Sequence, residues 1–445
     1  MRTQTFIVDH PNGEIQRHQV ISNFAWEQLC FQAPGFDPRA IEEIARLYRI
    51  NIVRKNPALY GTLAFFHLPA DRPHPFSHQV GDTTIHWPNV AAAKGLNTLA
   101  QEGLISYDGE WRCEDQTVVN FLESLADDSL VEVVQGEANS LCFVPLNRRL
   151  GFASTIEAPV VVNTHFFLMD PTDLDSPYCE LGTPYGLMLK DGVVALPPLN
   201  RRPCLVVDRS AKAQIKDLHI TDLSVEIDGV HYRHGEGVHF YTRPDERCTP
   251  PSNGTDLIIV EDRVVATKNG GESVIPMAGF VIATAHPVQI ADSQVTYHGL
   301  ENFLFGVQVG PPMVKEGKMF DHLAAPFYDG SAQKTAFPPT VYPLPYTDAR
   351  AARIAIGCDC DGNGLVMWSE GASKCRYVVR EDSTGASLLE LAQFCNQQGY
   401  QEILNLDGGG SAQILVAGMR HLQISDRYDC NSEAERPIPA LLTIH

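Results

Sequence analysis

The sequence predicts an α+β fold with a mixed β-sheet core, flanking helices and a smaller helix-rich region at the N-terminus. Apolar residues recur at helical spacing in residues 39–48, and 90–102 and 116–125 are further candidate helices. After residue 145, short apolar runs alternate with Asp-Gly and Asn-Gly turns, which is typical of hairpin strands. We therefore divide the chain into a helix-rich region of unknown role, residues 1–145, and a second domain, residues 146–445.

Two segments show the hairpin pattern clearly. Residues 186–194 and 224–232 each place an apolar, β-rich run on both sides of an Asp-Gly pair, Asp191-Gly192 and Asp228-Gly229. Glycine adopts positive φ without steric cost, as tight hairpin turns require. Each segment is therefore predicted to form two short strands around a turn.

A third hairpin is expected from strand 353–357, turn 361–364 and strand 365–368. Residues 359–364 place oxygen ligands at alternate positions, as a calcium loop does, and Glu370 falls at loop position twelve. Because an apolar strand lies between them, we favour the hairpin turn.

A helix is predicted from Ser387 to Gln398. Ser387 and Glu390 have the spacing of a capping box, and Gly399 stands where the helix should end. A buried-strand pattern follows at 402–406, then the glycine-rich segment Asp407–Ser411, and another apolar run from 412 to 418. The glycines therefore lie at a strand end.

Composition excludes several classes of partner. The 445 residues include 34 Lys and Arg against 54 Asp and Glu, a formal net charge of -20, which disfavours nucleic acid and anionic membrane surfaces. No apolar run approaches the roughly 20 residues that cross a bilayer, and the N-terminus does not resemble a secretory signal. We expect a cytoplasmic protein whose eleven cysteines are mostly reduced thiols.

The residues predict no cofactor and no metal site. His231, His234 and His239 lie near Glu236 and could ligate a metal, but histidines on exposed hairpins are more common without one. The pair Cys358 and Cys360 lacks the second pair that a zinc site needs.

The glycine-rich loop Asp407–Ser411 allows two interpretations. It can be a β-bulge or an irregular corner, where absent side chains solve a packing problem. It can also be a nest, in which bare backbone amides approach an anion or a sugar oxygen. The loop lacks the Lys of a phosphate-binding P-loop and opens no helix, so neither nucleotide motif applies. The residues alone leave both interpretations open.

Three ordered motifs resemble the phosphodiester glycosidase family. Residues 405–412, Asn-Leu-Asp-Gly-Gly-Gly-Ser-Ala, are similar to its signature, residues 353–357 to its Arg-Thr-Ala-Ile-Gly, and residues 163–167 to its Asn-Gly-Gly-Phe-Phe. The resemblance extends over residues 145–445 and implies a phosphodiester glycosidase-like domain. Thr164-His165 replaces the family's small residues, and Ile354 replaces its Thr. Weaker similarities lie at 186–192, 276–282 and 436–440.

The resemblance implies a hydrolase that cleaves the glycosidic C1–O bond of a sugar-1-phosphodiester or a nucleotide-sugar-like molecule. The net charge predicts no nucleic acid or membrane partner. Two different alternatives remain. The same fold could transfer the glycosyl unit or cleave the P–O bond, or the chain could be a non-catalytic carbohydrate- or nucleotide-binding module. The sequence does not predict the sugar, the stereochemical outcome or the oligomeric state.

The site that the resemblance implies combines charged side chains with bare amides. Each charged or polar member also has a structural alternative: an ion pair for the arginine, a turn cap for the aspartate and a core position for the histidine. Arg353 is predicted to face the phosphate and Asp407 to act as base or electrostatic carboxylate, with His165 as a further acid or base; Asn163, Gly408, Gly409, Gly410 and Ser411 are predicted to bind substrate oxygens.

Overall fold

The structure is a computed structural model of the 445-residue chain. It describes residues 1–43 except 12, 36, 38 and 41–42, the strands at 51–52, 63–67, 76–80, 83–87, 106–107, 111–112 and 140–145, and residues 147–445 except 148, 170–177, 200–201, 236, 244–245, 291–292, 321–349, 372–379 and 422–434.

The protein is mostly β-sheet, and the α+β prediction is wrong. Among the described residues, 50% lie in strands and 9% in helices. The α-helix with both ends among the described residues is α4, Leu388–Gln397. The prediction of a helix-rich N-terminal region is also wrong, because residues 1–145 contribute strands β1 to β10. Of the three helices expected there, only part of 39–48 is described, and Arg39, Ala40 and Glu43 are helical; 90–102 and 116–125 lie outside the described residues.

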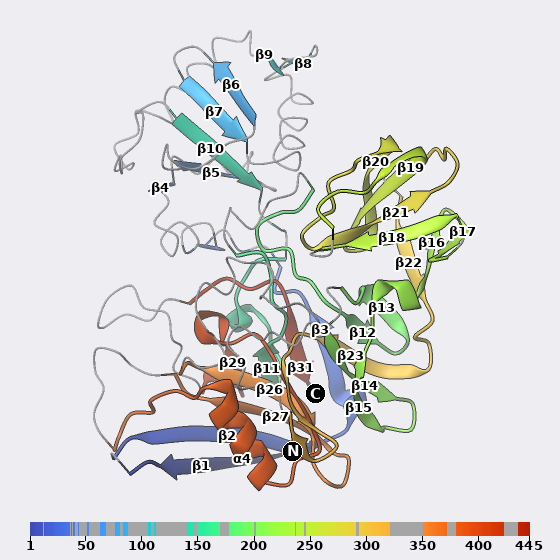
Figure 1. Ribbon diagram of the computed structural model, residues 1–445. Coiled ribbons are helices and arrows are strands. Elements are labelled where there is room, and N and C mark those ends of the chain that lie inside the picture. Colours follow the sequence, from blue (N-terminus) through green and yellow to red (C-terminus); the bar gives the residue numbers. More distant parts are fainter. Residues whose placement is uncertain are drawn as a thin grey trace.

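A seven-stranded sheet joins the N-terminal strands to strands from the far end of the chain (Figure 1). Its central strands are those predicted at 353–357, 365–368 and 402–406. Its order is β1 (Arg2–Asp9), β2 (Ile15–Phe24), β27 (Gly364–Ser369), β26 (Arg353–Cys358), β28 (Glu402–Asn405), β24 (Pro312–Lys315) and β25 (Lys318–Met319).

Two five-stranded sheets stand beside it. The first also takes in an N-terminal strand, β3, so residues 2–32 belong to sheets built mainly from later strands; the division at residue 145 stays a prediction. The first of the two sheets has the order β3 (Leu29–Gln32), β31 (Leu441–Ile444), β11 (Val160–Asn163), β29 (Ile414–Val416) and β30 (Met419–Arg420). The second has the order β13 (Val193–Leu196), β12 (Met188–Lys190), β23 (Phe303–Gln308), β14 (Pro203–Asp208) and β15 (Ala213–Asp217).

The remaining strands form a third five-stranded sheet and three smaller ones. Between β15 and β23 the chain builds a lobe, coloured yellow-green in Figure 1, from a three-stranded and a four-stranded sheet. The three-stranded sheet of the lobe has the order β17 (Val230–Arg233), β16 (Ser224–Ile227) and β22 (Val295–His298). The four-stranded sheet has the order β18 (Val238–Thr242), β21 (Gly279–Thr284), β19 (Pro251–Val260) and β20 (Arg263–Gly271). The N-terminal region forms the sheet β4 (Asn51–Ile52), β5 (Leu63–His67), β10 (Ser140–Pro145), β7 (Thr83–Trp87) and β6 (Phe76–Val80), and the pair β8 (Ser106–Tyr107) and β9 (Trp111–Arg112).

The central strands of the seven-stranded sheet, β26, β27 and β28, are buried on both faces. Side chains alternate between faces along a strand, so Ile354 and Ile356 of β26 join the core shared with the five-stranded sheets. Ala355, between them, faces a second core that contains Leu391 and Cys395 of α4. Two-sided burial explains why β26 and β27 read as continuous apolar runs.

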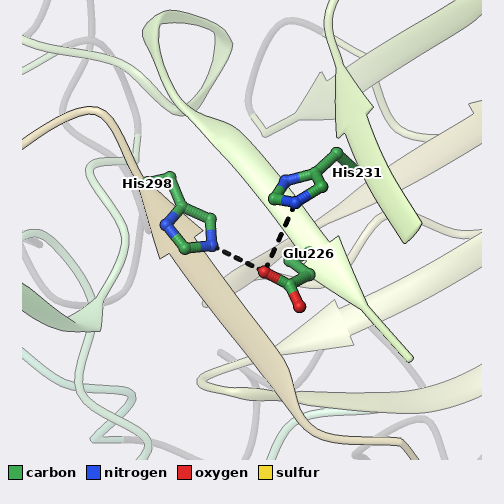
Figure 2. Close-up of side chains that lie close together, drawn as sticks. All are labelled: Glu226, His231 and His298. Carbon is green, nitrogen blue, oxygen red and sulfur yellow. Dashed lines mark hydrogen bonds and ion pairs between the residues drawn. The ribbon is translucent and has the colours of Figure 1, made fainter. Parts of the chain in front are cut away.

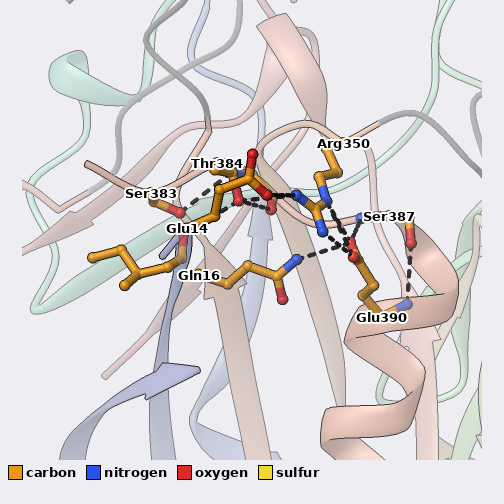
Figure 3. A network of polar contacts seen from close by, with 9 residues as sticks. Glu14, Gln16, Arg350, Ser383, Thr384, Ser387 and Glu390 are labelled. Atoms are coloured by element: carbon orange, nitrogen blue, oxygen red, sulfur yellow. Dashed lines mark hydrogen bonds and ion pairs between the residues drawn. The ribbon is translucent and has the colours of Figure 1, made fainter. Parts of the chain in front are cut away.

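The predicted capping box at the start of α4 is confirmed, and it connects three segments (Figure 3). The Glu390 amide donates to Ser387 Oγ at 3.1 Å, and the Ser387 amide donates to Glu390 Oε2 at 2.9 Å. Arg350 Nη2 and Gln16 Nε2 donate to the same carboxylate at 2.5 and 2.8 Å. Burial alone raises the pKa of Glu390, but these hydrogen bonds and the Arg350 charge lower it to about 2.

The predicted hairpins are confirmed as well. Asp191 and Gly192 have φ of 53° and 85°, and Asp228 and Gly229 have φ of 51° and 78°. In the hairpin between β26 and β27, Asp359 Oδ1 accepts hydrogen bonds from the amides two and four residues later, so this segment is a turn. No helix among the described residues is long and apolar enough to cross a membrane. Seven of the eleven cysteines are free thiols: Cys30, Cys179, Cys204, Cys248, Cys358, Cys360 and Cys395.

Candidate functional site

The glycine-rich loop lies where strands of two sheets end. After β28, the Leu406 amide donates to Ile354 O in β26 at 2.8 Å, and the next amide, of Asp407, donates to Thr164 O beyond β11 at 2.8 Å. The Gly409 amide then donates to Ala352 O at 2.7 Å. These bonds hold the loop between the start of β26 and the end of β11. The motifs at 163–167, 353–357 and 405–412, distant in sequence, are therefore adjacent in space.

Asn163 fixes the loop from its side chain. Its Nδ2 donates to the Asp407 carbonyl at 2.9 Å, and its Oδ1 accepts from the Gln413 amide at 2.7 Å. The side chain is 1% exposed. Asn163 therefore positions the loop on both sides of the glycines, and its predicted contact with substrate hydroxyls stays a prediction.

Replacing Asn163 with Ala is expected to destabilise the protein by about 2–4 kcal/mol, because two buried backbone groups lose their partners. Asn163→Asp keeps the acceptor for the Gln413 amide but buries a carboxylate against the Asp407 carbonyl, so at neutral pH it should cost at least as much. Urea unfolding of both variants measures the difference. Wild-type stability of the Ala variant would show that the two hydrogen bonds do not hold the loop.

The glycines give the loop its exposed surface. Gly408 and Gly409 are half-buried, whereas Asp407 is 7% exposed and Gly410 is buried. The Gly409 amide is used by Ala352 O, but among the described residues the amides of Gly408 and Gly410 donate no hydrogen bond. Two amides without a protein acceptor are what a nest for an anionic oxygen requires.

Close packing of main chains explains one glycine. A Cβ added at Gly408 would lie 2.8 Å from Ala352 O and 3.5 Å from the Arg353 Cα, although the φ of Gly408, -134°, suits any residue. Gly409 is different, with φ +61° and nothing within 4 Å of an added Cβ. Gly408 therefore allows contact with β26, and Gly409 provides the left-handed turn.

Arg353 and Arg436 bring two guanidinium groups to the loop. Arg353 begins β26, is 5% exposed, and donates from Nε to Ala386 O at 3.0 Å, which anchors the side chain beside the loop. Arg436 Nη1 donates to Ser411 Oγ at 3.1 Å, so the Ser411 hydroxyl, itself fully buried, contacts an arginine. Arg436 was not among the predicted site residues. Its position in the weak similarity at 436–440 was the one available signal.

His165 has the surroundings of a core histidine. It is 2% exposed, its Nδ1 lies 2.8 Å from Thr164 Oγ1, and its Nε2 lies 2.9 Å from Leu187 O. A carbonyl can only accept, so Nε2 carries the proton and Nδ1 accepts from the Thr164 hydroxyl. Burial lowers the pKa of His165 to about 4. The ring is neutral at pH 7, and its predicted role as acid or base stays a prediction.

Comparisons with known proteins confirm the resemblance found in the sequence. The family model described as phosphodiester glycosidase matches residues 236–445, which include the motifs at 353–357 and 405–412. A mouse relative, N-acetylglucosamine-1-phosphodiester alpha-N-acetylglucosaminidase, is 29% identical over 101 residues. That stretch is 22% of this chain and only 18% of the mouse protein.

Three solved structures are similar at 15% identity. The catalytic domain of the zebrafish N-acetylglucosamine-1-phosphodiester alpha-N-acetylglucosaminidase, auto-inhibited by its pro-peptide, has a TM-score of 0.33 over 66% of this chain and 67% of that one. A hypothetical protein from Synechocystis has a TM-score of 0.41, covering 99% of this chain and 61% of its own. A putative exported protein from Burkholderia pseudomallei also scores 0.41, with 100% and 96% covered.

Proposed function

We propose, from the match of residues 236–445 to the phosphodiester glycosidase family, that this protein hydrolyses the C1–O bond of a sugar-1-phosphodiester or a nucleotide-sugar-like molecule. The observation that supports this most directly is the loop Asp407–Ser411. It combines a carboxylate with two neighbouring arginines and with two amides that have no acceptor in the described part of the chain. An anionic diester and a cationic reacting carbon need these two kinds of group.

The phosphate is the part of the substrate that the amides and arginines suit. A guanidinium binds two phosphate oxygens at once, and backbone amides add donors that cost no side-chain entropy. We assign the phosphate to the amides of Gly408 and Gly410, with Arg353 and Arg436 as the nearby cations. These local donors outweigh the net charge of -20, since exposed charges farther than about 10 Å are largely screened.

Asp407 has the chemistry needed at the anomeric carbon. When the C1–O bond breaks, its electron pair leaves with the phosphate monoester, and positive charge develops on C1 and the ring oxygen. Water then adds to C1 and loses a proton. We assign to the Asp407 carboxylate either the acceptance of that proton or the stabilisation of the developing charge. Because a phosphate monoester leaves readily, the reaction has little need of an acid such as His165.

Incubating the protein with a panel of sugar-1-phosphodiesters and nucleotide sugars tests the proposal. The expected products are the free sugar together with a phosphate monoester from a sugar-1-phosphodiester or a nucleoside diphosphate from a nucleotide sugar, identified by mass spectrometry and phosphorus NMR. Transfer of the sugar to an added alcohol would indicate a transferase instead. Saturable binding without any product would indicate a binding module, and would contradict hydrolysis.

A further inference from the structure

We propose that Glu226, His231 and His298 form a binding site for a divalent transition-metal ion such as Zn²⁺ (Figure 2). One carboxylate oxygen and two imidazole nitrogens of these side chains all lie within 4.8 Å of one another. The site lies on the lobe and is distinct from the glycine-rich loop. Metal binding at this site would be a property separate from the proposed hydrolysis.

The three ligands come from three adjacent strands of one sheet. Glu226 of β16 pairs directly with His231 of β17. On its other side Glu226 pairs with Thr296 of β22, and His298 lies two residues farther along that strand. Residues directly opposite or two apart point to the same face of a sheet. The sheet register therefore brings the side chains together without any loop having to fold over them.

The distances suit a common ion. Glu226 Oε2 lies 2.9 Å from His298 Nε2 and 3.5 Å from His231 Nε2. Ligands of a tetrahedral Zn²⁺ lie about 2.0–2.2 Å from the metal, which separates neighbouring ligand atoms by roughly 3.3 Å. Small rotations of the two imidazoles satisfy this spacing. The side chains are 33% (Glu226), 59% (His231) and 37% (His298) exposed, so an ion can reach them and water can complete the coordination.

A second carboxylate lies close to one of the ligands. His298 Nδ1 lies 3.6 Å from Glu301 Oε1, on the side of the ring opposite Nε2. A carboxylate that accepts the Nδ1 proton leaves the Nε2 lone pair for the metal, an arrangement common to metal-binding histidines. The Gly299 amide donates to the same Glu301 oxygen at 2.9 Å, which holds that carboxylate in place. A small movement of the His298 ring would let Glu301 accept the Nδ1 proton and orient the ring for the ion.

The sequence pattern suggested a different group of histidines. Among His231, His234 and His239, the second is already used, because its Nδ1 accepts a hydrogen bond from the Phe240 amide at 3.0 Å. His298 is 67 residues beyond His231 and had no visible link to it. Only the pairing of β16 with both β17 and β22 makes the cluster.

The position suggests what the ion would do. β16 and β22 lie at the two ends of the chain segment that builds the rest of the lobe, and β22 leads into β23 of the main body. An ion held by both strands would clamp the base of the lobe. Metal binding should therefore stabilise the folded protein as well as occupy the site.

The test uses the full chain, freed of metal by a chelator, and zinc chloride as the probe. Calorimetric titration should show one Zn²⁺ site in the wild type that Glu226→Gln and His298→Ala each weaken at least tenfold. Zn²⁺ should raise the melting temperature of the wild type and not of these variants. With Co²⁺ in place of Zn²⁺, the wild type should give the intense visible absorption of a four-coordinate ion.

His239→Ala is the matched control, since it removes a histidine of the same lobe that is outside the cluster; it should bind Zn²⁺ as the wild type does. Far-UV circular dichroism of the metal-free variants checks that each is folded. Equal Zn²⁺ affinity in the wild type, Glu226→Gln and His298→Ala would overturn the proposal, as would no binding at all. Either result would mean that the cluster is a set of histidine–carboxylate ion pairs only.

Discussion

Asp407→Asn is expected to lower kcat/KM on a cleavable sugar-1-phosphodiester by about 10²–10⁴-fold. The substitution preserves the shape of the side chain and removes the charge that we assign to the anomeric carbon. Because the Asp407 amide and carbonyl make the hydrogen bonds that hold the loop, the backbone should stay in place. The melting temperature should therefore remain close to that of the wild type.

The control for this variant is Asp361→Asn. Asp361 is an exposed residue in the turn between β26 and β27, and the same chemical change there should leave kcat/KM unaltered. Arg353→Lys provides a second comparison, since it keeps the charge but loses the two-oxygen fork. It should raise KM more than it lowers kcat if the guanidinium binds phosphate in the ground state. Full activity in Asp407→Asn would mean that another group supplies the carboxylate function.

Gly408→Ala is expected to reduce kcat/KM by about 10²–10³-fold, the loss associated with displaced main-chain donors. The added methyl group would meet Ala352 O at 2.8 Å, so either the loop or the start of β26 must shift. Both sides of this contact belong to the proposed site. Such crowding in a packed region costs about 1–3 kcal/mol of stability as well, which thermal unfolding would detect.

Gly418→Ala is the control for Gly408→Ala, because it destabilises the backbone at a glycine outside the proposed site. Gly418 has φ +75° and nothing within 4 Å of an added Cβ, so Ala there costs about 1–2 kcal/mol of backbone strain without any clash. Kinetic constants measured for both variants should show activity lost in Gly408→Ala and retained in Gly418→Ala. Equal activity in the two would show that contact between the loop and β26 is irrelevant to turnover.

Sequence patterns predicted the C-terminal elements well, because interactions between residues close in the chain determine where those elements begin and end. The capping box of Ser387 and Glu390, the glycine after α4 and the Asp-Gly turns each act over a few residues. The prediction failed in the N-terminal region. There β2 pairs with β27, some 350 residues away, which no local pattern reveals, and β1 joins the sheet through β2.

The same distinction holds for the candidate site. The glycine-rich loop was visible in the sequence because bare glycines at a strand end are unusual, and the family resemblance linked it to Arg353 and Asn163. The contact of Arg436 with Ser411 was not visible, because no local pattern indicates which of the side chains near the C-terminus folds back onto the loop. For His165, the buried bond to Leu187 O explains a core position that the sequence offered only as an alternative.

The most direct test of the central claim follows the oxygen of water into the products. Hydrolysis of a sugar-1-phosphodiester in ¹⁸O-labelled water should place the label at C1 of the released sugar, with none in the phosphate monoester. Mass spectrometry of the two products reads this out. Label in the phosphate monoester would mean that the P–O bond breaks, and would contradict attack at the anomeric carbon beside Asp407.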